Sequence, residues 1–159
     1  MGEIFIELKN EIIVILLAAA PVSELRGAIP VAISLGFSPA QSMALAIFGN
    51  MIPVPILLIL LNPVFNYLGK INGFKKIIDW IKKRTLRKSE KIRKYKIIGL
   101  FLLVAIPLPT TGAWTGTIAA TLFNFKFKEA FFAIFLGVIV AGIIVVMLSV
   151  QASSLFELI

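Results

Sequence analysis

The sequence predicts an all-α integral membrane protein made of two inverted repeats. Each repeat is expected to be a proline-broken re-entrant helical hairpin followed by one transmembrane helix, with a basic amphipathic cytoplasmic helix joining the two. Three observations lead to this prediction. The chain is 59% hydrophobic, its short and long apolar segments follow the same order twice, and most of its basic residues lie in one stretch.

The composition indicates a single membrane domain over residues 1–159. A mean hydropathy of +1.00 is far above that of a soluble globular domain. We divide the domain into repeat 1 (1–68), a basic linker (69–96) and repeat 2 (97–159). The sequence contains neither cysteine nor histidine, which removes disulfides, thiolate chemistry and the usual zinc ligands. We therefore expect no cofactor and no metal.

The first hairpin is predicted at residues 12–35. Its apolar pieces, 12–20 and 28–35, are each too short to cross about 30 Å of hydrocarbon, which takes roughly 20 helical residues. Between them lie Glu24 and Arg26, flanked by Pro21 and Pro30, which disfavour one regular helix. Ionisable residues at membrane depth usually line a cavity or pair with each other. A turn follows, with Ser38 placed to cap the next helix.

The first full span is predicted at residues 39–61, a stretch of 23 residues without a formal charge. Pro53 and Pro55 lie inside it, so we expect a kink near Asn50. The second half repeats this order. A short apolar piece at 97–106 is broken by the proline- and threonine-rich segment 107–116, continues at 117–123, and is followed by a second span at 130–150.

The two halves of the sequence can be aligned, although few residues are identical. The alignment pairs 20–21 with 106–107, places 27–28 near 112–113, pairs 35–37 with 121–123 and, after a two-residue insertion, pairs the segment from Gly49 with that from Gly137. The shared order of elements supports the repeat more strongly than the matched residues do.

The charge distribution predicts the topology. Twelve of the 16 basic residues lie in residues 70–96, where apolar residues recur at helical spacing and Trp80 could anchor the helix at the membrane surface. If each hairpin returns to its own side, this loop shares one face with Lys126 and Lys128, and both termini lie on the other. Basic residues favour the cytoplasmic side, so we expect a cytoplasmic loop 70–96 in a multi-pass protein of the cell membrane. Nucleic-acid binding, the other interpretation of a basic cluster, is not expected beside membrane segments.

The segment SELRGAIP at 23–30, with Pro107, Pro109, Thr110, Thr111 and Gly112 in the second half, resembles the small multi-drug export protein family. More distantly, the layout is similar to that of the DedA (SNARE-associated, VTT) membrane proteins. That resemblance implies re-entrant hairpins with buried acidic and arginine residues, and a role in lipid translocation. The second hairpin of this chain lacks the embedded acidic residue that DedA proteins usually carry there.

The candidate substrate-binding residues are Glu24, Arg26, Asn50, Pro107, Pro109, Thr110, Thr111 and Gly112. Each also has a structural interpretation. Glu24 and Arg26 could form an ion pair, which requires non-helical backbone because residues two apart on a helix do not face each other. The threonines could bond carbonyls freed by the prolines. Asn50 could bond another helix, and Gly112 with Gly116 could be a packing motif.

These observations predict a transporter that moves a small molecule or a lipid through a midplane site formed by the two hairpins. Its cargo would be small organic cations or a lipid with an anionic head group, and ion coupling is left open. Membrane lipids and the transported molecule are the expected partners, and homo-oligomerisation is also left open. We do not expect an enzyme, because catalysis would need a nucleophile with a base, or a metal cluster. The alternatives are an intramembrane enzyme and a non-transporting, membrane-shaping protein.

Overall fold

The computed structural model describes residues 2–68, 90–108 and 111–156, and within them every regular element is a helix. The helices are α1 (Gly2–Ala19), α2 (Glu24–Ser34), α3 (Pro39–Met51), α4 (Pro53–Leu68), α6 (Glu90–Ala105), α7 (Ala113–Leu122) and α8 (Phe127–Phe156). The prediction of an all-α protein is confirmed for these residues.

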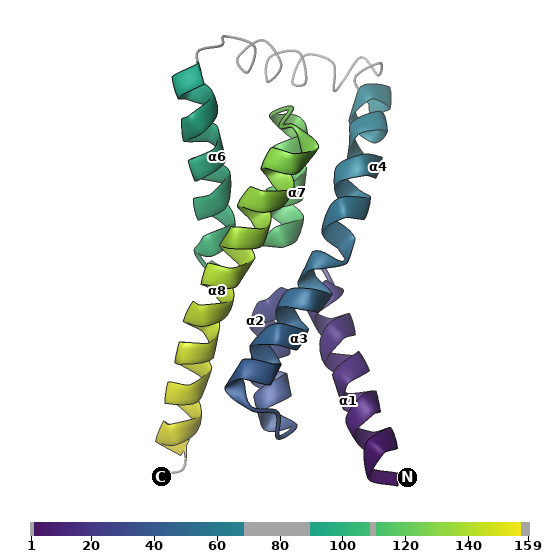
Figure 1. Ribbon diagram of the computed structural model, residues 1–159, viewed down its shortest axis with the longest axis vertical. Helices are drawn as coiled ribbons and strands as arrows, with labels where there is room; N and C mark the ends of the chain where they lie inside the picture. Colours follow the sequence, from purple (N-terminus) through teal and green to yellow (C-terminus); the bar gives the residue numbers. More distant parts are fainter. Residues whose placement is uncertain (1, 69–89, 109–110, 157–159) are drawn as a thin grey trace.

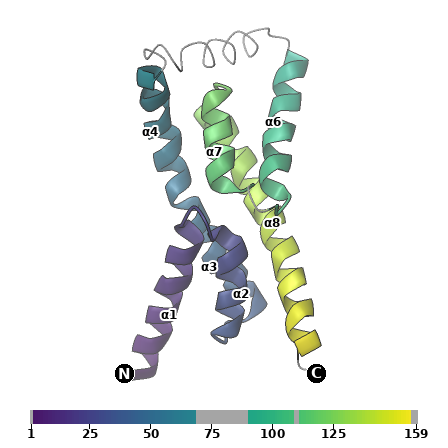
Figure 2. The same ribbon diagram turned by 180° about the vertical axis from the view of Figure 1, so that it is seen from behind.

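Two helical hairpins approach the middle of the molecule from opposite ends. Helix α1 runs inward from the end that holds both termini, and α2 folds back beside it after a short turn (Figures 1 and 2). Helices α6 and α7 do the same from the other end (Figure 1). Residues 12–35 therefore form two packed helices and not one kinked helix, and the two hairpin tips meet near the centre.

The two remaining segments are long and apolar enough to cross a membrane. They are Pro39–Leu61, which is 23 residues long, and Phe127–Ala152, which is 26 residues long. The first breaks at Ile52, between α3 and α4, because Pro53 has no N–H to donate to the Gly49 carbonyl. The Ile52 N–H donates to that oxygen instead, at 3.3 Å. The predicted kink near Asn50 is confirmed.

Large apolar side chains cover much of the outer surface. Ile56, Leu60, Phe132 and Met147 are each more than half exposed, and they lie on the two long segments. A soluble monomer rarely exposes so much contiguous apolar surface, whereas contact with lipid tails requires it. The buried interior contains many alanines instead, which lets helix backbones approach closely.

Two glycines allow the outer helices of the hairpins to pack on the long segments. A Cβ atom at Gly49 of α3 would lie 2.5 Å from the Ile15 carbonyl oxygen and 2.9 Å from the Ala18 Cβ of α1. At Gly137 of α8 it would lie 3.0 Å from the Phe101 carbonyl oxygen and 2.7 Å from the Val104 Cβ of α6. Helix α1 thus packs on α3 in the same way as α6 packs on α8, through the glycines that the sequence alignment pairs.

The turns after the two hairpins also match, but at a different register from the aligned sequences. The Phe37 N–H donates to the Ala32 carbonyl at 3.1 Å, and the Phe125 N–H donates to the Ala120 carbonyl at 3.0 Å. The residue before each phenylalanine is left-handed, with φ of 92° at Gly36 and 52° at Asn124. The turn at 35–37 is therefore equivalent to 123–125 and not to 121–123. The two-residue insertion lies earlier, before Ala120.

The predicted linker helix mostly falls on residues 69–89, which lie outside the described part of the chain. Its last residues belong to α6, which begins at Glu90. The predicted cap before α3 is confirmed. The Ser38 hydroxyl accepts the Gln41 N–H at 3.3 Å, and the Gln41 side chain accepts the Ser38 N–H at 3.1 Å.

The glycine packing predicts that Gly49→Ala destabilises the protein. The added methyl group meets backbone atoms of α1 that cannot move aside, and overpacking of this kind costs about 1–3 kcal/mol. We expect thermal unfolding in detergent at a temperature lower by about 3–10 °C. The matched control is Gly99→Ala on α6, where a Cβ would meet nothing within 4 Å. A Gly49→Ala protein as stable as the Gly99→Ala protein would contradict the proposed close packing.

Candidate functional site

The buried carboxylate of Glu24 binds the second hairpin. Glu24 is the first residue of α2 and has a left-handed backbone, with φ of 45°, so its side chain leaves the hairpin tip and does not follow the helix. Its Oε1 accepts the backbone N–H of Trp114 at 3.2 Å, and the Ala113 N–H also interacts with the carboxylate. A residue of the first hairpin therefore holds the start of α7.

The start of α7 requires such a partner from elsewhere in the protein. The first N–H groups of a helix have no acceptor within the helix, and the N-cap residue Gly112 has no side chain to supply one. A Cβ atom at Gly112 would overlap the Glu24 carboxylate. The absence of a side chain at Gly112 thus makes room for an external cap. The partial positive charge of the helix N-terminus also favours the carboxylate there.

A second bond joins the same two tips, this time from a side chain of the second hairpin to the backbone of the first. The indole Nε1 of Trp114 donates to the carbonyl oxygen of Ala19, at the end of α1, over 3.0 Å. The Ser23 hydroxyl donates at 2.5 Å to the Leu17 carbonyl, which also accepts the Ala20 N–H at 3.3 Å, so two side-chain donors serve carbonyls in the last turn of α1. We call the Glu24–Trp114 and Trp114–Ala19 bonds together the tip contact.

Arg26 lies beside this contact. Its Nη2 is 3.8 Å from Glu24 Oε2, an oxygen that accepts no hydrogen bond within the described part of the chain. The two residues can face each other because the φ of Glu24 lies outside the helical range, as the sequence analysis requires for a pair. The Arg26 side chain is 24% exposed and that of Glu24 only 7%, so the arginine is the more accessible of the two charges.

Other predicted site residues have different surroundings. The Thr111 hydroxyl donates to the Ile106 carbonyl at 2.7 Å and accepts the Leu108 N–H at 3.1 Å, which matches its structural interpretation. Pro107 is half-buried in the same turn. Pro109 and Thr110 lie outside the described residues.

Asn50 is fully buried on α3, just before the break at Ile52. Neither polar atom of its amide has a hydrogen-bond partner in the residues that the structure describes. An unpartnered buried amide costs about 1–3 kcal/mol, so this group is available to a water molecule or a ligand. No contact between Asn50 and the tip contact is established. The structure thus brings together Glu24, Arg26 and Gly112 from the predicted set, and Asn50 as a substrate-binding residue stays a prediction.

Trp114 is the site residue that sequence reasoning missed. It stands in a segment otherwise made of small and threonine residues, and a buried indole N–H usually needs an acceptor. The need of the Trp114 indole N–H for an acceptor was the sequence signal that could have identified this residue. Gly116, by contrast, has the predicted packing role, since a Cβ there would lie 2.5 Å from Val104 Cγ2 of α6. Among the described residues, no three His, Cys, Asp or Glu side chains gather that could hold a metal ion.

Comparison with known families assigns the chain. The model of the family described as "putative small multi-drug export protein" matches residues 24–144. The chain belongs to this family. The match begins at Glu24 and contains Glu24 and Trp114 of the tip contact, whereas Ala19 precedes it. Membership in this export family, together with the two candidate spans, makes the chain a membrane protein. Neither the curated proteins nor the solved structures contain a match. The more distant resemblance to the DedA proteins stays a prediction.

The tip contact predicts that Gly112→Ala loosens the junction between the hairpins of this family member. The new methyl group would occupy the position of the Glu24 carboxylate and force it off the Trp114 N–H. Losing a hydrogen bond to a charged group costs about 1.5–3 kcal/mol. We expect a lower thermal stability. In a Trp80→Phe background, where Trp114 is the single tryptophan, we also expect the tryptophan fluorescence emission to shift to longer wavelength. Gly99→Ala in the same background should show neither change. Unchanged emission from the Gly112→Ala protein would refute the arrangement.

Proposed function

We propose that this protein is a multi-pass transporter that exports a small molecule along the interface between its two hairpin tips. The family match supports export, and the central, buried Glu24 supports the location. Charged residues at membrane depth are rare and usually mark a pathway. The proposal does not include catalysis, because the sequence has no cysteine and no histidine to act as nucleophile or base.

The tip contact is the observation that carries the proposal. Its two hydrogen bonds join the tips of the two hairpins, and breaking them would leave the helices of each hairpin folded. A hydrogen bond to a charged group contributes about 1.5–3 kcal/mol and a neutral one about 0.5–1.5 kcal/mol. Opening both bonds thus costs a few kcal/mol. A ligand with a modest preference for the open state can supply that energy.

The internal equivalences support the two-repeat part of the proposal. Counting back from the equivalent turns at Phe37 and Phe125, Glu24 corresponds to Gly112 and Arg26 to Trp114. Two residues related by a two-fold axis contact each other when they lie on that axis. Glu24 lies against Gly112, as expected if such an axis passes between them. Helix α2 also contacts α8, while α7 contacts α4. We propose inverted re-entrant repeats whose tips part on one side at a time.

The charges define two candidate cargoes. When Glu24 leaves α7, its carboxylate is free to hold a small organic cation or to exchange a proton. Exchange of a proton at the freed carboxylate would also couple export to the movement of that ion. Arg26, always protonated and 24% exposed, favours an anionic group instead, such as a lipid head group. The exposure of Arg26 is the specific observation behind this second candidate, a lipid translocase.

Transport should depend on both charges. In vesicles containing the purified protein, we expect Glu24→Gln and Arg26→Ala each to reduce transport at least tenfold while the proteins still insert. Glu11→Gln, which changes an acidic residue of α1 away from the tips, is the matched control. Separate assays with a cationic dye and with a fluorescent anionic lipid distinguish the two cargoes. Full activity of both site variants would remove these residues from the mechanism.

The proposed topology places residues 70–96 in the cytoplasm and both termini outside. The chain has no cysteine, so single cysteines can be introduced at Ser34 and Ser89. Ser34 is exposed at the end of α2 and does not cap a helix, unlike Ser38. An impermeant thiol reagent should label the Ser34→Cys protein in intact cells, and the Ser89→Cys protein only after permeabilisation. The opposite pattern would reverse the orientation. Equal labelling or equal protection of both would contradict a membrane span at 39–61, which alone separates the two positions.

A further inference from the structure

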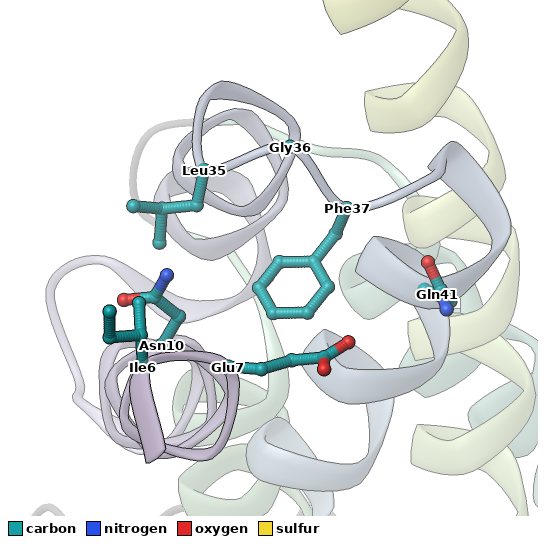
Figure 3. A pocket seen from close by; sticks show the side chains of 7 residues that line it. All are labelled: Ile6, Glu7, Asn10, Leu35, Gly36, Phe37 and Gln41. Atoms are coloured by element: carbon teal, nitrogen blue, oxygen red, sulfur yellow. The ribbon is translucent and has the colours of Figure 1, made fainter. Parts of the chain in front are cut away.

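A pocket remote from the tip contact opens at the end of the molecule that holds both termini. It has a volume of about 260 Å³ and lies between α1 and the turn that joins α2 to α3 (Figure 3). Side chains of Ile6, Glu7, Asn10, Leu35, Phe37 and Gln41 line it. The proposed export mechanism does not use these residues.

The lining combines one negative charge with an aromatic ring and apolar walls. In Figure 3 the side chains of Glu7 and Phe37 extend toward the same space, which Leu35 also borders. A cation held near a carboxylate and a ring face is attracted by both, and alkyl groups on that cation can contact apolar walls. An inorganic ion would be attracted by the carboxylate and the ring but would gain nothing from the apolar walls. The chemistry therefore matches a small organic ammonium ion.

The backbone that carries the ring and one polar wall are held in place before any ligand binds. The backbone of Phe37 is held by its bond to the Ala32 carbonyl. The Gln41 side chain is held by the N–H and hydroxyl of Ser38, at 3.1 and 3.0 Å. Groups held in place lose little conformational entropy on binding, which favours recognition by a small site.

The equivalent turn at the other end of the molecule provides a natural comparison. It borders a pocket of about 280 Å³ between α4 and the turn from α7 to α8. Phe125, the counterpart of Phe37, lines that pocket, and none of its lining residues in the described part of the chain is charged. This second pocket faces α4, whereas the pocket beside Phe37 faces α1. It therefore offers a cavity of similar volume with the equivalent phenylalanine but without a residue like Glu7 among its described lining.

We propose that the Glu7–Phe37 pocket binds a small organic ammonium ion through the Glu7 carboxylate and the Phe37 ring. Its volume is slightly below the range of about 300–1,000 Å³ that accommodates drug-sized ligands, so the ligand is small. The trimethylammonium group of free choline and that of a phosphatidylcholine head group share this chemistry. Any link between this pocket and exported cargo rests on the proposed function, whereas the binding itself does not.

The test uses the purified full-length protein in detergent without added lipid, titrated with choline and followed by ligand-observed saturation-transfer NMR. The uncharged isostere 3,3-dimethyl-1-butanol is titrated in parallel. We expect choline to bind at least tenfold more tightly than the isostere. Equal binding of the two compounds by the unmodified protein, or no choline binding, would overturn the proposal.

Variants then locate the site. Glu7→Gln should weaken choline binding at least tenfold, and Phe37→Leu should weaken it about fivefold, as expected for a partly exposed cation–π contact. Glu11→Gln on the same helix and Phe125→Leu in the second pocket are the matched controls and should bind choline normally. Circular dichroism and size exclusion establish that each variant is folded. Unchanged binding by a folded Glu7→Gln protein would refute the assignment.

Two further arms separate this inference from the proposed function and identify the source of the ligand. Glu24→Gln should stop transport yet bind choline normally, so a failure of export and a failure of this pocket give different results. Short-chain phosphatidylcholine should displace choline where short-chain phosphatidylglycerol does not, if a lipid head group is the source. If neither lipid displaces choline, the pocket is specific for the free ammonium ion.

Discussion

The tertiary structure depends on one buried carboxylate that neither hairpin can accommodate alone. The buried carboxylate of Glu24 needs donors, and the start of α7 needs an acceptor that Gly112 cannot provide. The indole of Trp114 returns a donor to the end of α1. Because each tip supplies what the other lacks, the hairpins are stable when their tips meet. The same bonds join the two halves of the molecule.

Close helix packing supports this contact. Lipid tails are as apolar as the side chains they surround, so helices in a membrane associate through van der Waals contact and hydrogen bonds, and burial of apolar surface drives little of it. Gly49 and Gly137 let α1 and α6 approach the long segments. Gly116 lets α7 approach α6, and Gly112 lets a charged side chain reach a helix terminus. Small residues thus determine how near the tips can come.

The two halves of the molecule have matching turns and differ in their chemistry. The matching turns occur at Phe37 and Phe125, yet the residues at the tips are Glu24 and Arg26 in one half and Gly112 and Trp114 in the other. The first half therefore contributes the charges, and the second contributes space and backbone donors. This division produces a single asymmetric site, in which one carboxylate serves both halves.

The sequence by itself determined the elements, because apolar length and proline position act locally. It predicted the span at 39–61, the kink near Asn50, the cap at Ser38 and the broken segments on either side of Glu24. It also selected Glu24, since a charge among apolar residues is conspicuous. It placed the two-residue insertion too late in the alignment of the two halves, so it paired the turn at 35–37 with residues two positions too early. Apolar residues match at several offsets, and only the bonds of the left-handed turns fix one. The partners of Glu24 were decided by tertiary structure alone. Almost every residue has a backbone N–H, so the sequence does not indicate which one bonds to Glu24. Residues 24 and 114 meet only when both hairpins fold back.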